Sequence, residues 1–128
     1  MKILGVGVDI VDNKRIQKSV KNKSFIKRVF SKKELILVKN KKDKISFFSK
    51  RFAAKESLSK ALGTGFRNDL NFVDITILND KLGKPYFLLN KKISQFVFKR
   101  FKIKSFNFFL SISDEKNYSI AFTILQTK

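Results

Sequence analysis

The sequence predicts a mixed α+β fold, on the strength of three patterns. Residues 3–11 combine two glycines with β-branched and apolar residues, as expected for a buried strand. Residues 45–63 contain no proline and reach their first glycine only at position 63, which predicts a long helix with a glycine stop. Two pairs of apolar segments flank polar turns and predict antiparallel hairpins on either side of a helix over residues 91–101 capped by Asn90: 72–78 with 86–89, and 106–112 with 118–125.

The middle of the chain predicts short helices before the long one. Asn13 is placed to cap a helix over residues 14–20, and a helical turn is expected over 24–30. Ser31 and Glu34 have the spacing of a capping box and open a helix that runs to about residue 39. At 128 residues, the chain suits a single domain over residues 1–128 with a core of its own.

The composition excludes several kinds of chemistry. The chain contains no Cys and no His, so disulfides, thiol nucleophiles and imidazole bases are ruled out. A metal bound only by carboxylates would be a hard cation such as magnesium or manganese. No apolar run has membrane-spanning length and the N-terminal segment lacks a signal-peptide pattern, so we expect a cytoplasmic protein.

The net charge of +19 raises the alternative of a non-enzymatic module that binds nucleic acid. Two observations disfavour it. Only 5 of the 29 basic residues are Arg, the residue preferred for bidentate phosphate and base contacts, and the 24 Lys residues are spread along the chain. The richness in Lys, Ile, Phe and Asn is also typical of a codon bias toward A and T, which accounts for much of the charge without a function.

Two acidic residues stand out. Asp9 interrupts the apolar strand, where a carboxylate needs a partner, a metal or a solvated face, and the local sequence does not decide among these. Glu56 lies in the long helix among Arg51, Lys55 and Lys60, a pattern that suits a phosphate or a phosphate-bound metal. Taken alone, that helix is more simply interpreted as having a solvated charged face.

Two segments together resemble the holo-acyl-carrier-protein synthases, the small bacterial 4′-phosphopantetheinyl transferases. They are Gly5 to Ile16 (GVGVDIVDNKRI) and Arg51 to Gly65 (RFAAKESLSKALGTG). The Gly-Lys-Pro turn at residues 83–85 and the last hairpin fit the same family pattern, so the resemblance covers essentially the whole chain.

The resemblance implies a fold of the phosphopantetheinyl transferase type and a magnesium-dependent reaction that supports fatty acid biosynthesis. The 4′-phosphopantetheine arm of coenzyme A is transferred to a serine of acyl carrier protein, and adenosine 3′,5′-bisphosphate leaves. It further implies a homotrimer with sites between neighbouring subunits. No membrane and no nucleic acid partner are expected.

The resemblance also implies roles for individual residues. Asp9 and Glu56 match the magnesium ligands, and Glu56 and Lys60 the catalytic residues. The carrier protein is expected to contact Lys14 and Arg15, although any helix of so basic a chain would carry such residues. The positions expected to contact coenzyme A are Arg51, Lys55, Lys60, Gly63, Gly65, Pro85 and Asp114.

The general base stays open at this point. Some members of the family carry His at the position of Asp114, which this chain cannot use. The candidates are Glu56, directly or through a metal-bound water, and Asp114. For Asp114, the favoured interpretation is an ordinary residue of a hairpin turn.

Overall fold

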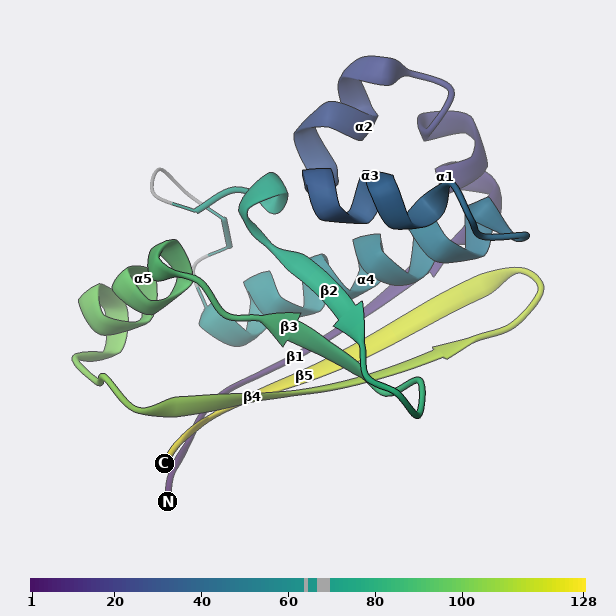
Figure 1. Cartoon of the computed structure of the whole chain (residues 1–128). Helices are drawn as coiled ribbons and strands as arrows, with labels where there is room; N and C mark the ends of the chain where they lie inside the picture. The colour runs from purple at the N-terminus through teal and green to yellow at the C-terminus, as the bar shows by residue number, and fades with distance from the viewer. Residues whose placement is uncertain (64, 67–69) are drawn as a thin grey trace.

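The two ends of the chain meet in one antiparallel sheet. β1 (Ile3–Asp12), β5 (Tyr118–Thr127) and β4 (Phe106–Asp114) pair in the order β1-β5-β4. The termini therefore lie side by side at one end of the sheet (Figure 1). The computed structural model describes residues 1–63, 65–66 and 70–128, so Thr64 of the glycine motif lies outside the described residues.

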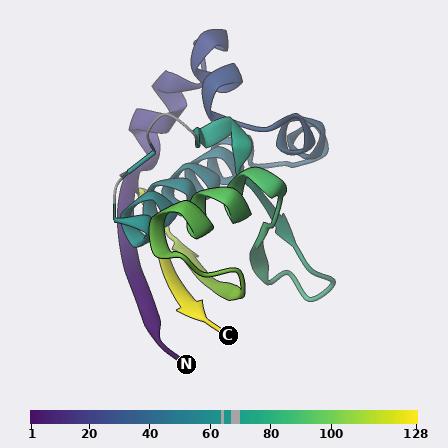
Figure 2. The same ribbon diagram turned by 90° about the vertical axis from the view of Figure 1, so that its left-hand side faces the viewer.

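The long helix α4 (Lys44–Leu62) lies along one face of this sheet, with most of its contacts to β1 and β5. It is buried on nearly all sides, because the sheet covers one face and other elements cover the rest. The helix α5 (Lys91–Phe101) lies near the C-terminal end of α4, where Arg100 would be 3.6 Å from a Cβ on Gly63 (Figure 2). The remaining elements are α1 (Asn13–Ser19), α2 (Lys23–Val29), α3 (Lys32–Val38), η1 (Phe72–Asp74), β2 (Thr76–Asn79) and β3 (Pro85–Leu88).

These elements confirm the predicted α+β class, with a strand first, a helical middle and two hairpins around a helix. The long helix ends where expected, at Gly63 in the left-handed region with φ of 82°. The capping box of Ser31 and Glu34 is present, and Asn90 caps α5. The two hairpins do not share a sheet, since β2 and β3 pair only with each other.

Two details differ from the prediction. Residues 72–74 form a 3-10 turn rather than the start of a strand, because the Asp74 carboxylate accepts from the Asn71 amide and the backbone closes i to i+3 bonds. At the first helix, Asp12 rather than Asn13 is the cap, and its carboxylate accepts from Lys14 N at 2.9 Å. Asn13 instead binds Glu115, Lys116 and Ser119 of the β4–β5 hairpin.

The register of the sheet separates its two faces. Gly7 and Asp9 lie opposite Thr123 and Ala121, and both of these β5 residues are fully buried under α4. The alternate positions face away from α4 and leave a row of apolar side chains exposed by between 39% and 60%: Val6, Val8, Ile10, Ile120 and Phe122. Among the described residues, no helix is both long and apolar enough to cross a lipid bilayer.

Candidate active site

Two glycines bring the first strand into direct backbone contact with α4. A Cβ atom on Gly5 would lie 1.7 Å from the Ala61 carbonyl oxygen, and one on Gly7 would lie 1.9 Å from the Ser57 carbonyl oxygen. No side chain fits at either position, which explains the alternation of glycine with β-branched residues. Because Asp9 follows on the same face, its carboxylate is held against the helix.

Glu56 and Lys60, one turn apart on α4, meet Asp9 at this contact. The Lys60 ammonium donates to the Asp9 carboxylate at 3.1 Å and to the Val8 carbonyl at 3.0 Å. Burial and the negative charge of Asp9 raise the pKa of Glu56, while Lys60 and Arg15 act in the opposite direction. The structure thus brings Asp9, Glu56, Lys60 and Arg15 into one group, in which the two carboxylates are half-buried and the two cations are exposed.

This group has the donors that a hard divalent cation prefers. Two carboxylates would supply oxygen ligands, and burial together with the charge of Asp9 makes the ionised form of Glu56 costly, as the raised pKa of Glu56 indicates. No cluster of three or more Asp, Glu, His or Cys residues occurs in the described part of the chain. The other positions of an octahedral shell would therefore come from substrate oxygens and water, and the assignment of Asp9 and Glu56 as magnesium ligands stays a prediction.

Lys55 is not a neighbour of this group. Its side chain is fully buried, and its ammonium donates to Glu34 at 2.6 Å and to the carbonyls of Val29 and Phe72. Burial is the main cause that lowers the pKa of Lys55 to about 8, against the pairing with Glu34. Because every donor is used inside the core, the structure gives Lys55 a structural role in place of the predicted contact with coenzyme A.

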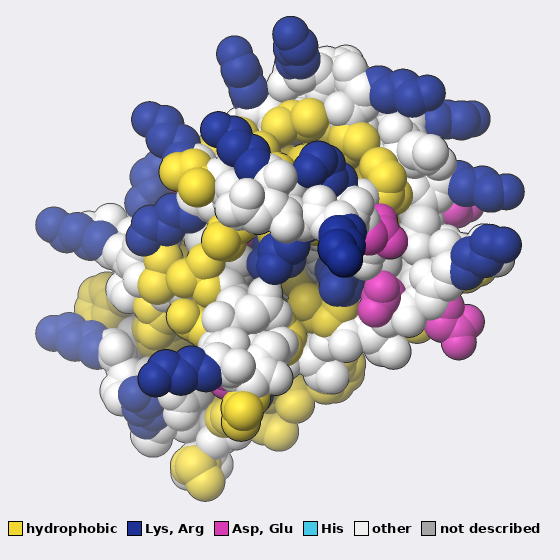
Figure 3. Space-filling model, turned by 45° about the vertical axis from the view of Figure 1, so that its right-hand side comes forward, with side chains coloured by type: hydrophobic (Ala, Val, Ile, Leu, Met, Phe, Trp, Pro, Cys, Tyr) yellow, Lys and Arg dark blue, Asp and Glu magenta, His cyan; other side chains and the backbone are white. Residues whose placement is uncertain are grey.

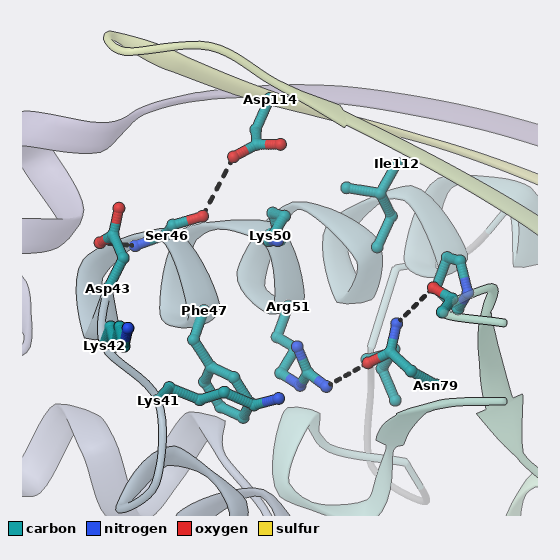
Figure 4. Close-up of a pocket in the computed structure, with 13 residues that line it drawn as sticks. Lys41, Lys42, Asp43, Ser46, Phe47, Lys50, Arg51, Asn79, Ile112 and Asp114 are labelled. Atoms are coloured by element: carbon teal, nitrogen blue, oxygen red, sulfur yellow. Dashed lines mark hydrogen bonds between the residues drawn. The ribbon is translucent and has the colours of Figure 1, made fainter. Parts of the chain in front are cut away.

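A second group of predicted residues lines a separate cavity of about 490 Å³. Arg51 comes from the N-terminal half of α4 and Asp114 from the end of β4 (Figure 4). Pro85 comes from the start of β3. Three lysines add positive charge to the same wall: Lys41, Lys42 and Lys50. The cavity is thus suited to an anionic ligand, and neither Asp9, Glu56 nor Lys60 lines it.

Two hydrogen bonds order the walls of this cavity. Ser46 Oγ donates to Asp114 at 3.0 Å, and Arg51 Nη2 donates to Asn79 Oδ1 at 3.0 Å (Figure 4). The Arg51 guanidinium also stacks on the Phe47 ring at 3.8 Å. Asn79, Ser46 and the three lysines were not predicted from the sequence, since nothing in their local pattern separates them from ordinary turn and surface residues.

The other predicted residues lie at two further places. Gly63 and Gly65, both with positive φ (82° and 69°), follow Lys60 at the end of α4. The side chain of Ser59 would lie 3.5 Å from a Cβ on Gly65. Lys14 and Arg15 are exposed on α1, directly after the strand that carries Asp9. Both lie where a partner could reach them.

Comparison with known proteins defines the class of this site. The model of the 4′-phosphopantetheinyl transferase superfamily matches residues 5–123, and the chain belongs to this family. Among individual proteins, it is similar to the holo-[acyl-carrier-protein] synthase of Pelagibacter ubique, with 68% identity over the full length of both chains.

Solved structures agree with this assignment. The crystal structure of the holo-[acyl-carrier-protein] synthase from Neisseria meningitidis superimposes with a TM-score of 0.89 at 35% identity, covering 98% of this chain and all of that one. The synthase from Bacillus anthracis, solved in complex with CoA (3′,5′-ADP), gives a TM-score of 0.82 at 32% identity and 98% coverage of both chains.

Proposed function

We propose that this chain transfers the 4′-phosphopantetheine arm of coenzyme A to a serine of apo acyl carrier protein, as the name of its full-length relatives indicates. The observation that carries the proposal is the meeting of Asp9, Glu56 and Lys60 at one contact between β1 and α4. The product is holo acyl carrier protein, which serves fatty acid biosynthesis, and the expected compartment is the cytoplasm.

The reaction is a displacement at phosphorus. The serine oxygen forms a bond to the phosphorus that carries the pantetheine arm, and the bond from that phosphorus to adenosine 3′,5′-bisphosphate breaks. Positioning and charge neutralisation dominate such transfers. We propose that the Lys60 ammonium, which lies beside Asp9, neutralises charge on the pyrophosphate. Asp9 and Glu56 would hold a magnesium ion, which supplies further neutralisation when bound.

The serine proton needs an acceptor, and two residues are candidates. Glu56 lies in the group with Asp9 and Lys60, on the side of α4 where the pyrophosphate is proposed to bind. Asp114 lies in the other cavity, where it accepts from Ser46. We favour Glu56, because Asp114 already has a structural partner at the hairpin.

We further propose that the complete site forms between subunits of a homotrimer. Two features support this. The predicted coenzyme A residues fall into two groups on one chain, with Lys60 in one and Arg51, Pro85 and Asp114 in the other. The sheet face opposite α4 also exposes the row from Val6 to Ile10, which a neighbouring copy would cover.

The carrier protein is proposed to dock on α1, where Lys14 and Arg15 are exposed. Acyl carrier proteins are acidic partners for such a surface. Figure 3 shows that basic side chains project from all around one face of the molecule, rather than forming a single stripe. This spread favours general attraction of acidic partners over a nucleic-acid groove.

The test is one assay. Apo acyl carrier protein is incubated with coenzyme A, magnesium and the chain, and the intact mass is measured. We expect a mass gain of one phosphopantetheine arm with the wild type, and none with Asp9→Ala or Glu56→Ala at unchanged circular dichroism. Undiminished labelling by both variants would contradict the proposed site. Tight duplex binding that survives physiological salt would favour the nucleic-acid alternative.

A further inference from the structure

Asn79 occupies a junction in the wall of the cavity that contains Arg51. It ends β2, and its side chain makes two hydrogen bonds in opposite senses. Its Oδ1 accepts from Arg51 Nη2 at 3.0 Å, and its Nδ2 donates to the Gly83 carbonyl at 2.9 Å (Figure 4). The exposed amide of Asn79 therefore links Arg51 on α4 to the turn that precedes Pro85.

The Arg51 guanidinium is buried, but not all of its N–H donors have a hydrogen-bond partner. Arg51 is only 4% exposed, and burial lowers its pKa against the effect of Glu34. Among the described residues, Arg51 donates a hydrogen bond to Asn79, while its buried Nε has no hydrogen-bond partner and lies 3.9 Å from a Glu34 carboxylate oxygen. A guanidinium has five N–H donors; Nε faces Glu34 and Nη2 donates to Asn79, so the remaining donors on the two terminal nitrogens could serve a ligand.

Contacts on several sides fix the direction of this guanidinium. The Phe47 ring lies against its face at 3.8 Å, and Glu34 lies beyond Nε. Asn79 is the contact at the outer end. Without its oxygen, the outer end of the side chain would lose its hydrogen-bond partner, and the guanidinium would no longer be ordered before the ligand arrives.

The turn on the other side of Asn79 depends on the same amide. Gly83 has φ of 91°, and a Cβ there would meet nothing within 4 Å. Hydrogen bonds order the turn: Asp80 exchanges backbone bonds with Gly83 and Lys84, its carboxylate accepts from Leu82 N and Lys84 N, and Asn79 donates to the Gly83 carbonyl. Loss of the Asn79 amide would loosen the turn as well as the cation.

We propose that Asn79 is a positioning residue for coenzyme A binding, which orders the Arg51 guanidinium and the Gly83–Pro85 turn as two walls of one anion-binding cavity. This inference rests on the proposed function. It assigns to Asn79 an effect on ground-state binding of the substrate, exerted through Arg51, and no part in the chemical step.

The test is a steady-state comparison of Asn79→Ala with Asn90→Ala, using coenzyme A as the varied substrate and apo carrier protein as the acceptor. Asn90 is a matched control, because its exposed amide also accepts one hydrogen bond, from Ile93 N, and donates one, to the Asp74 carbonyl, at the start of α5. We expect Asn79→Ala to raise KM for coenzyme A about tenfold with kcat within about twofold, as for a lost charged hydrogen bond used in uniform binding. Asn90→Ala should lower the melting temperature and leave KM unchanged.

A double-variant cycle shows whether Asn79 acts through Arg51. In an Arg51→Lys background, which lacks the planar fork, Asn79→Ala should add little to KM. If Asn79→Ala folds poorly, Asn79→Ser replaces it in the test. The serine side chain is too short to reach both partners, so this variant should show the same rise in KM. Equal KM values for the wild type and both Asn79 variants, or full additivity with Arg51→Lys, would overturn the inference. Absence of transfer by the wild type would instead overturn the proposed function.

Discussion

The glycine contact between β1 and α4 can be broken by one methyl group. In Gly7→Ala, the new Cβ would lie 1.9 Å from the Ser57 carbonyl oxygen and 2.7 Å from Ala61 N, whereas ordinary contacts begin at 3.4 Å. Both obstructing atoms belong to the helix backbone, so no side-chain rotation relieves the clash. The strand must move away from α4 by about 1.5 Å, unless the helix moves instead.

Gly7→Ala should reduce stability moderately and transfer activity strongly. Overpacking of this kind costs about 1–3 kcal/mol, which lowers the melting temperature of a domain of this size by about 5–15 °C. Asp9 is two residues further along the strand, and its 3.1 Å contact with Lys60 would not survive a shift of that size. Since a misplacement of about 1 Å costs about 100-fold in rate, we expect at least that loss of transfer activity.

The assay combines thermal melting with transfer to apo carrier protein below the lowered melting temperature. For the melting experiment, Gly83→Ala is the control for replacing a glycine, since its Cβ would meet nothing within 4 Å and only its φ of 91° is unfavourable. It should cost about 1–2 kcal/mol of strain without a clash. Wild-type melting and transfer by Gly7→Ala would refute the reasoning that glycine sets the distance between strand and helix.

Three further outcomes are expected. Glu56→Gln should abolish transfer but raise the melting temperature of the metal-free protein at neutral pH, because burial and Asp9 raise the pKa of Glu56 and make its charge costly in the folded state. This gain in melting temperature should disappear as the pH falls toward 4.5. No gain at pH 7 in the presence of a chelator would contradict this prediction. The wild type should gain stability between pH 8 and 10.5 relative to a Glu34→Gln/Lys55→Met double variant. The reason is that burial lowers the pKa of Lys55 to about 8, so the unfolded chain binds more protons than the folded chain in this window. If the difference between the two denaturant midpoints does not change with pH, the assignment of a buried ammonium is contradicted. A 1:1 coexpressed mixture of Glu56→Ala and Arg51→Met chains should recover about a quarter of wild-type sites if each site takes its two groups from neighbouring subunits; mass assays showing no recovery would argue against shared sites.

The sequence predicts most of the fold because its signals are local. The Gly63 stop, the Ser31 capping box and the Asn90 cap each depend on residues within one turn, and all three were confirmed. The prediction that the second strand begins at residue 72 was wrong, also because of a local interaction. Asp74 offers its carboxylate to the backbone of Asn71, and this local bond prevails over the alternation of apolar residues.

The site was predictable only in part. Asp9 and Glu56 stood out in the sequence, but the backbone contact of Gly5 and Gly7 with α4 that brings them together follows only from the tertiary fold. Lys55 was misplaced because its partner Glu34 lies 21 residues earlier, and helix spacing says nothing about such a neighbour. The role of Asn79 could not be predicted either. It depends on a hydrogen bond to the Arg51 guanidinium, which lies 28 residues away in the sequence and is brought close only by the tertiary fold.

The central claim is that Asp9 and Glu56 together hold the divalent cation of a phosphopantetheinyl transferase. Binding of Mn²⁺ in the presence of coenzyme A, followed by electron paramagnetic resonance, tests it directly, because Mn²⁺ shares the oxygen ligands of magnesium. We predict a bound-metal signal in the wild type, its loss in Asp9→Ala and in Glu56→Ala, and its retention in the control Glu115→Gln, which removes an exposed carboxylate outside both groups. Equal metal binding by the wild type and both alanine variants would contradict the account.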